Sequence, residues 1–292
     1  DGKTCWFPRL QKILKQLEKY KMNHHTRHDT QLLAPKNRII LLGASNLTLS
    51  LRWVIHLMQQ QLGGGNEILV ANGHGRAYGM SSQVLLRGLP GIVASGLWNQ
   101  LASSGPRPTY ALLTDIGNDI LYGSSPEQIL RWVEWCVEQL RQQSAQMVVT
   151  NLPIVAIEDL SERRYGFFRK LFYPSCQLPR HETVSRVRAV HRGLMDMAAR
   201  WNFSLYEQDA VWFGPDGIHV NYWQRKAFYQ DVLKRFSSSG LNDLQVSAEN
   251  SSGSWLAWQR RPQFAYKTVS GRAIYCPQPS GWLADGAAIY KY

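Results

Sequence analysis

The stretch Arg38-Ile39-Ile40-Leu41-Leu42-Gly43 is, after its arginine, continuously apolar and ends in glycine. A run of this length that is bounded by a turn signal is typical of a strand buried on both faces of a parallel sheet. Similar runs recur at residues 67–71, 109–114, 146–151 and 203–207. The pattern therefore predicts a parallel five-stranded sheet.

Stretches of helical period separate these strands. The predicted helices cover residues 46–62, 78–88, 92–103, 125–143, 182–201 and 221–236. Connections of this length join parallel strands through crossovers, and alternating strands and helices are typical of a three-layer α/β/α domain. In such sheets, functional side chains gather at the carboxyl ends of the strands.

The first two strand ends carry groups suited to acyl chemistry. Ser45 follows the first strand at a strand-to-helix turn, where its hydroxyl is exposed and the start of the helix favours an oxyanion. The second strand is followed by the loop Asn72-Gly73-His74-Gly75-Arg76, whose glycines allow the main chain to approach a substrate closely. These two ends predict a nucleophile and a main-chain oxyanion donor.

Two later strand ends complete the set. Asn118, in Thr114-Asp115-Ile116-Gly117-Asn118-Asp119, offers a side-chain amide as a further oxyanion donor. The loop Asp216-Gly217-Ile218-His219 places a carboxylate three residues before an imidazole, so that the carboxylate can fix the tautomer of the base.

Each of these residues also has a purely structural interpretation. Ser45 is a preferred helix N-cap residue, and Asn118 and Asp119 are typical of local turns. The glycines form turns in many loops, and Asp216 with His219 can be a structural pair. Because all four groups follow strands in the order nucleophile, donor, donor and base, the catalytic interpretation is favoured. Asp115 is assigned a structural role.

These residues resemble the four motif blocks of the SGNH, or GDSL-like, hydrolases: a Gly-x-Ser turn, a glycine, a Gly-x-Asn-Asp stretch and an Asp-x-x-His loop. The resemblance covers about residues 38–236 and implies a flavodoxin-like sheet with helices on both faces. It implies Ser45 as nucleophile, His219 as base and Asp216 as its orienting group. It also implies an oxyanion hole of Ser45, Gly75 and Asn118, and no metal or organic cofactor.

The sequence departs from this family in the first block and leaves the second open. Gly43-Ala44-Ser45 stands where the family usually has Gly-Asp-Ser, which removes a carboxylate that is not a catalytic group. The second-block glycine is Gly75, Gly73 or Gly79, in that order of preference. Gly73, His74 and Arg76 are expected to bind substrate, with the two basic side chains selecting negative charge or many hydroxyls.

The expected activity is that of a carboxylic ester hydrolase working through an acyl-enzyme, on a small acyl ester or an O-acetylated carbohydrate. The alternative is an SGNH-fold protein that transfers acyl groups, or that binds an acidic polymer or glycan without catalysis. An α/β-hydrolase is disfavoured because Leu47 occupies the last position of its Gly-x-Ser-x-Gly elbow. The glycine-rich stretches contain no Gly-Lys-Ser/Thr, so a phosphate-binding Walker loop is also disfavoured.

Charge and composition predict two additions to this domain. The formal net charge is +12, and residues 1–40 hold nine Lys or Arg against three acidic residues. Residues 1–37 are interpreted as a basic arm with an amphipathic helix, 38–236 as the hydrolase domain, and 237–292 as a polar linker with an aromatic-rich extension. The extension either stacks on sugars or bases, or forms a strand-rich addition packed on the main domain. Residues 158–180, rich in Arg, Phe and Tyr, form either a pocket wall or a packed surface loop.

Other functional classes find little support. Cys5, Cys136, Cys176 and Cys276 are widely spaced, which indicates neither a metal site nor a disulfide framework. A cluster of histidines, His24, His25 and His28, lies in a polar segment without an acidic partner. No apolar run reaches the roughly 18 residues of a membrane-spanning helix. No nucleic-acid partner is expected, and the oligomeric state stays open. The expected compartment is the cytoplasm, with an export signal removed before Asp1 as the alternative.

Overall fold

The computed structural model describes residues 35–237 and 257–292. The predicted amphipathic helix, the histidine cluster at residues 24–28, Cys5 and most of the predicted linker lie outside the described residues. From Lys36 onward, the described residues belong to one compact unit.

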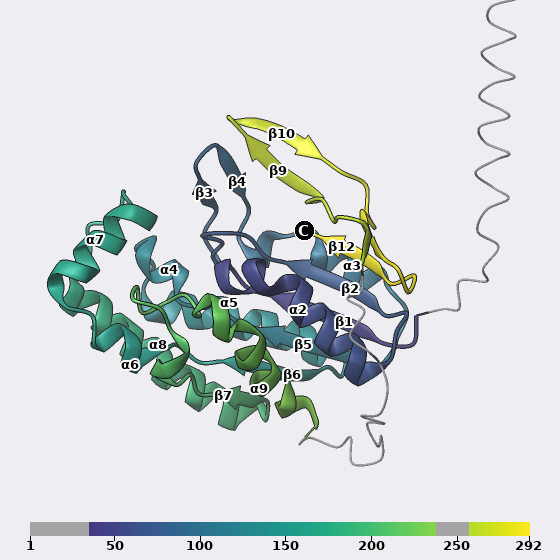
Figure 1. Ribbon diagram of the computed structural model, residues 1–292, viewed down its shortest axis with the longest axis horizontal. Helices are drawn as coiled ribbons and strands as arrows, with labels where there is room; N and C mark the ends of the chain where they lie inside the picture. The colour runs from purple at the N-terminus through teal and green to yellow at the C-terminus, as the bar shows by residue number, and fades with distance from the viewer. Residues whose placement is uncertain (1–34, 238–256) are drawn as a thin grey trace, which may run out of the picture. The chain divides into compact units, whose positions relative to one another are not determined.

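The five predicted strands are all present and form the core of one sheet. They are β1 (Arg38–Leu42), β2 (Glu67–Ala71), β5 (Thr109–Leu113), β6 (Gln146–Thr150) and β7 (Ser204–Tyr206). They run parallel in the order β7-β6-β5-β1-β2 (Figure 1). Numbered along the chain, this is the flavodoxin-like order 2-1-3-4-5 read from the other edge. The predicted fold class is confirmed.

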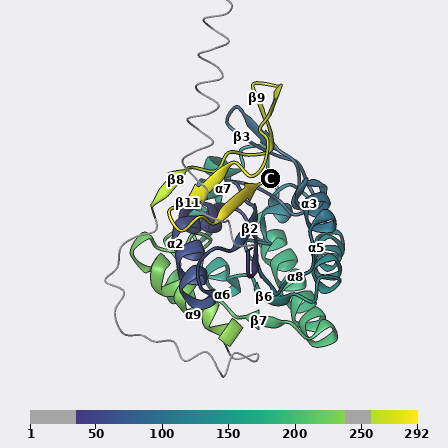
Figure 2. The same ribbon diagram turned by 90° about the vertical axis from the view of Figure 1, so that its right-hand side faces the viewer.

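Helices cover both faces of this sheet. The main helices are α2 (Ser45–Leu62), α3 (Leu97–Ser103), α5 (Pro126–Arg141), α8 (Arg180–Trp201) and α9 (Arg225–Ser237). Figure 2 shows α3, α5 and α8 on one side of the sheet and α2 and α9 on the other. Ile40 and Leu42 pack in the core that α3, α5 and α8 share, whereas Ile39 and Leu41 pack in the core of α2 and α9. Successive residues of a strand point to opposite faces, so an uninterrupted apolar run supplies both cores.

The predicted helix over residues 78–88 is wrong. The chain forms a hairpin there, with β3 (Ser82–Val84) and β4 (Arg87–Leu89) joined at Leu85, whose φ is +54°. Strand β4 also pairs with β9 (Tyr266–Val269), which itself pairs with β10 (Arg272–Tyr275). The partner strand lies far along the chain, so local periodicity carried no sign of it.

The C-terminal extension enlarges the predicted sheet from five strands to eight. Strand β12 (Ala288–Lys291) lies parallel to β2, and β11 (Gly281–Leu283) and β8 (Trp258–Arg260) follow with antiparallel pairing. Of the two interpretations of this segment, the strand-rich one agrees with the structure. The strands of the segment continue the main sheet.

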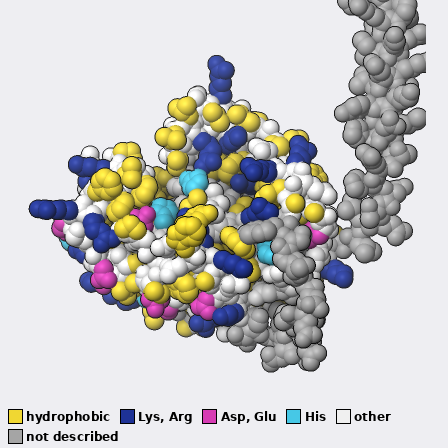
Figure 3. Space-filling model, viewed as in Figure 1, with side chains coloured by type: hydrophobic (Ala, Val, Ile, Leu, Met, Phe, Trp, Pro, Cys, Tyr) yellow, Lys and Arg dark blue, Asp and Glu magenta, His cyan; other side chains and the backbone are white. Residues whose placement is uncertain are grey.

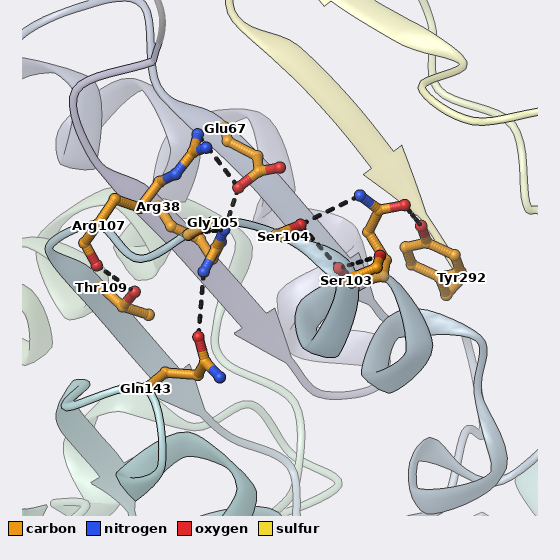
Figure 4. A network of polar contacts seen from close by, with 10 residues as sticks. Arg38, Glu67, Ser103, Ser104, Gly105, Arg107, Thr109, Gln143 and Tyr292 are labelled. Carbon is orange, nitrogen blue, oxygen red and sulfur yellow. Dashed lines mark hydrogen bonds and ion pairs between the residues drawn. The ribbon is translucent and has the colours of Figure 1, made fainter.

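A buried polar network lies at the amino ends of β1 and β2. The Arg38 side chain is fully buried, and its Nε donates to Glu67 Oε2 at 2.6 Å. Its other nitrogens donate to the main-chain oxygen of Gly105 at 3.0 Å and to Gln143 Oε1 at 3.4 Å (Figure 4). These contacts satisfy a cation that burial would otherwise destabilise.

Two further features are not present among the residues that the structure describes. None of the helices there combines the length and the apolar character that crossing a membrane requires. Within the same residues, His, Cys, Asp and Glu side chains form no group of three suited to a metal ion.

Candidate active site

Three side chains from two segments that are distant in sequence form a continuous hydrogen-bonded relay. Ser45 is the first residue of α2, directly beyond the carboxyl end of β1. Its Oγ lies 2.9 Å from His219 Nε2, and His219 Nδ1 lies 2.6 Å from Asp216 Oδ2. An imidazole held in this way can accept a proton from the hydroxyl on one side while the carboxylate stabilises the resulting charge on the other.

The carboxylate of Asp216 builds the loop as well as orienting the ring. Its Oδ1 accepts hydrogen bonds from the N–H groups of Ile218 and His219 at 3.1 and 2.9 Å. Gly217 has φ +72°, and a Cβ there would come within 2.7 Å of a main-chain oxygen, so glycine is required. Burial alone would raise the pKa of Asp216, but the hydrogen bonds and charge of His219 outweigh it and lower the pKa below its usual value. The orienting group is therefore ionised at neutral pH.

Asn46 joins the serine turn to the histidine loop, a role that the sequence analysis missed. Its Nδ2 donates to the main-chain oxygen of Ile218 and its Oδ1 accepts from the N–H of Val220, both at 2.9 Å. The Asp115 carboxylate accepts a hydrogen bond from the same Nδ2 at 2.9 Å through Oδ1, and one from the N–H of Ala44 at 2.8 Å through Oδ2. The structural role expected for Asp115 agrees with these contacts. The only sequence signal for Asn46 was its position next to Ser45.

The expected oxyanion donors lie at neighbouring strand ends. The N–H of Ser45 is in the first turn of α2, where a helix supplies no acceptor of its own. Asn118 begins α4 (Asn118–Leu121), and its Nδ2 donates to the main-chain oxygen of Arg76 at 2.8 Å. The oxygen of Gly75 accepts from the Tyr122 hydroxyl at 2.7 Å, so the glycine loop is held against α4.

The hydrogen bonds of the three candidate glycines differ. The N–H of Gly79 already donates to Asp119 Oδ1 at 3.1 Å, so it is not available to a substrate. Asp119 is fully buried and also accepts from Tyr78 and Met80, which anchors this segment. Among the described residues, the N–H groups of Gly73 and Gly75 have no such acceptor.

Arg76 does not take the position expected of a substrate-binding residue. It is completely buried, and its guanidinium donates to the main-chain oxygens of Asn72, Pro90 and Tyr292. Its length allows it to turn inward and join β2 to the C-terminal strands, which the local sequence did not indicate. Gly73 is also buried, with Leu89 in the space that its side chain would fill. His74 is half-buried; burial, and then the charges of Arg87, His219, Lys291 and Arg225, lower its pKa.

An apolar pocket adjoins Ser45 and Asp216 and has a free volume of about 100 Å³. Its wall comes largely from α6 (Ile154–Glu158), α7 (Glu162–Phe172) and the segments that flank them. The apolar lining includes Ile116, Ile120, Leu121, Leu152, Ile157, Leu160, Tyr165, Phe168, Phe172, Tyr173 and Val187. Residues 158–180 therefore form a pocket wall rather than a separate surface loop. Gly73, His74 and Arg76 are not part of this lining.

Phe172 connects this wall to the relay. Its ring meets the His219 ring edge-to-face, with centroids 5.3 Å apart. It also stacks on Phe168 at a centroid distance of 6.0 Å. The imidazole is thus held by a carboxylate at one nitrogen and by an aromatic ring at its side.

Comparisons with known proteins concern the fold. No protein-family model matches the sequence, and no curated protein matches it. One solved structure aligns over 70% of this chain and 98% of its own, at 14% identity and a TM-score of 0.50. An aryl esterase of M. smegmatis aligns over 69% of this chain and 99% of its own, at 15% identity and a TM-score of 0.49. A member of the lipolytic protein G-D-S-L family from Veillonella parvula aligns over 70% and 99%, at 12% identity and a TM-score of 0.42.

The strand order of the sheet and the positions of the four motif blocks agree with each other. The five core strands have the flavodoxin-like order, and the blocks lie beyond the carboxyl ends of β1, β2, β5 and β7. The chain therefore has a flavodoxin-like α/β/α fold with the four blocks at one edge of its sheet.

Proposed function

We propose that this protein is a serine esterase of the SGNH type. The observation that carries the proposal is the relay from Ser45 through His219 to Asp216, with both hydrogen bonds at 2.9 Å or less. A serine hydroxyl is a weak nucleophile at neutral pH, and an adjacent oriented base is the usual means of activating it. The structural interpretations of these residues do not account for a hydroxyl aimed at the free nitrogen of an imidazole.

In the proposed mechanism, Ser45 Oγ attacks the ester carbonyl as His219 Nε2 takes its proton. The N–H groups of Ser45 and Gly75 and the Asn118 amide hold the oxyanion of the tetrahedral intermediate. His219 then gives its proton to the leaving alkoxide, and the C–O bond of the ester breaks. Water, deprotonated by the same imidazole, releases the acyl group from Ser45. Preorganised donors of this kind supply a large share of the rate enhancement in acyl transfer.

The apolar pocket supports an ester with an apolar acyl or aryl group. Its lining beside Ser45 is mainly aliphatic and aromatic, which favours burial of carbon rather than of hydroxyl groups. A small acyl ester fits this description better than the body of a carbohydrate does, although an O-acetyl group would place only its methyl there. Transfer to an alcohol uses the same acyl-enzyme, so an added acceptor alcohol with product analysis distinguishes transfer from hydrolysis.

A fluorophosphonate probe tests the proposal, since it labels only activated serines. We expect labelling and hydrolysis of 4-nitrophenyl acetate by the wild type, and neither by Ser45→Ala. Ser185→Ala, at an exposed position of α8, is the matched control and should behave as the wild type. Absence of labelling in a folded wild-type protein, or undiminished labelling of Ser45→Ala, would overturn the proposal.

A further inference from the structure

Three cationic side chains gather near the carboxyl ends of β2 and β12 without an acidic side chain beside them. Lys291 Nζ lies 4.2 Å from the centroid of the Phe264 ring, and Arg87 Cζ lies 5.3 Å from the same centroid. Arg76, fully buried, adds a third charge that acts on both. Across the described part of the chain, none of the three has an acidic side chain within 4.0 Å.

Hydrogen-bond donors in this cluster are left unused. Arg76 Nη2 and Arg87 Nε are buried and have no acceptor among the described residues. A buried donor without an acceptor is costly, and more so when it carries charge. Burial, followed by the neighbouring cations, lowers the pKa of Lys291 to about 8 and that of Arg76 to about 9. The cluster thus destabilises its own charged form unless an anion joins it.

The register of the sheet places this cluster two strands away from the strand that leads to the serine. Lys291 pairs with Val70 of β2, and Val70 pairs with Leu41 of β1. Two strand spacings, about 10 Å, therefore separate Lys291 from Leu41, which precedes Ser45 by one short turn. His74 is near both groups: burial, and then the charges of Arg87, His219 and Lys291, lower its pKa. On the side of the molecule that Figure 3 draws, Lys and Arg side chains lie close to His side chains.

We infer that Arg87 and Lys291 form a subsite for an anionic group, a carboxylate or phosphate, carried by the ester substrate. This inference rests on the proposed esterase function. The guanidinium of Arg87 offers planar paired donors, and the Lys291 ammonium adds a point charge. Arg76 adds positive charge nearby while its hydrogen bonds to main-chain oxygens remain in place. The substrate then has an apolar group for the pocket and an anionic group for this subsite.

Matched esters test the subsite through a ratio of kcat/KM values. Mono-(4-nitrophenyl) succinate against 4-nitrophenyl butyrate tests a carboxylate, and acetylglycerol phosphate against acetylglycerol tests a phosphate. We expect the wild type to prefer the anionic member of at least one pair, and the preference to fall with added salt. Arg87→Gln and Lys291→Gln should each lower that preference about tenfold, which corresponds to about 1.4 kcal/mol. Arg272→Gln, which removes one exposed cation from β10, should keep it.

A binding measurement separates failure of the subsite from failure of the esterase proposal. In the Ser45→Ala protein, succinate or inorganic phosphate should raise the melting temperature more than sodium chloride at equal ionic strength. The rise should disappear in Ser45→Ala combined with Arg87→Gln, and persist with Arg272→Gln. If the protein hydrolyses neutral esters but shows neither a preference for anionic esters nor this rise in melting temperature, the subsite proposal is wrong and the esterase proposal is retained. A rise without any ester turnover would support the subsite and count against the esterase.

Discussion

Arg38 and Arg76 are both completely buried, yet they lie at opposite ends of the same parallel sheet and are treated differently. Arg38, at the amino end of β1, has an ion pair with Glu67 at 2.6 Å and further acceptors. Arg76, beyond the carboxyl end of β2, bonds only main-chain oxygens and leaves Nη2 without a partner. The two arginines are similar in burial and differ in the charge around them.

The contrast between the two arginines indicates that the amino end of the sheet serves stability and the carboxyl end serves function. At the amino end, the buried charge of Arg38 is paired with the carboxylate of Glu67, and Arg107 lies within 3.5 Å of the same carboxylate. At the carboxyl end, the relay of Ser45, His219 and Asp216 and the unpaired cations face the loops. Groups that are to bind or react must keep part of their bonding capacity unused, which is why functional sites accumulate strain and unsatisfied groups. Substitutions at the two ends should therefore have different consequences.

The largest effect is expected from His219→Ala. Loss of the base should lower kcat for a 4-nitrophenyl ester by about 10⁴-fold or more, because the serine is no longer activated. The free energy of unfolding should change far less than for a substitution at the amino end. His181→Ala, exposed on α8, is the control. Retention of more than a tenth of the activity in His219→Ala would contradict the mechanism.

Glu67→Gln tests the amino end. It leaves the Arg38 charge buried without its counter-ion, so urea unfolding should show a loss of about 3–5 kcal/mol. Activity per folded molecule should stay the same, since the site is at the other end of the sheet. Glu162→Gln breaks an exposed pair with Arg180 and should cost about 1 kcal/mol or less. Equal losses in the two variants would show that the buried network does not dominate stability.

Asn118→Ala tests the oxyanion hole. Loss of one donor should lower kcat by about 10²- to 10³-fold with a smaller change in KM, because the hydrogen bond strengthens as the oxyanion forms. Asn99→Ala, exposed on α3, should leave both constants unchanged. A rise in KM with kcat preserved would assign Asn118 to substrate binding instead.

The smallest effect concerns pH. Because the pKa of Asp216 is lower in the folded state than the ordinary value of about 3.9, its ionised form stabilises the fold above that pH. This contribution is lost as the pH falls through the folded pKa. The stability difference between wild type and Asp216→Asn, followed by urea unfolding from pH 7 to pH 3, should shrink below about pH 4. If the stability difference does not vary with pH, the pKa of Asp216 is not lowered in the folded state.

Prediction from sequence succeeded where the signal was local and failed where a distant partner decided the outcome. The run from Arg38 to Gly43 and its four counterparts predicted the parallel core, since burial on both faces demands apolar residues at every position. The 78–88 segment was misread because β4 takes its conformation from pairing with β9. The wall formed by α7 was left undecided, because aromatic residues are equally suited to a pocket and to a surface loop.

The sequence by itself determined the strand-and-helix order and the position of Ser45, Asn118 and the Asp216 loop at strand ends, because these depend on periodicity and turns. Only the tertiary structure decided which groups meet. It brought Ser45 within hydrogen-bonding distance of His219, turned Arg76 inward, and aligned Lys291 with β1 through β2. Strand register and long side chains act across the sheet rather than along the chain, so their outcome is set by packing of the whole domain.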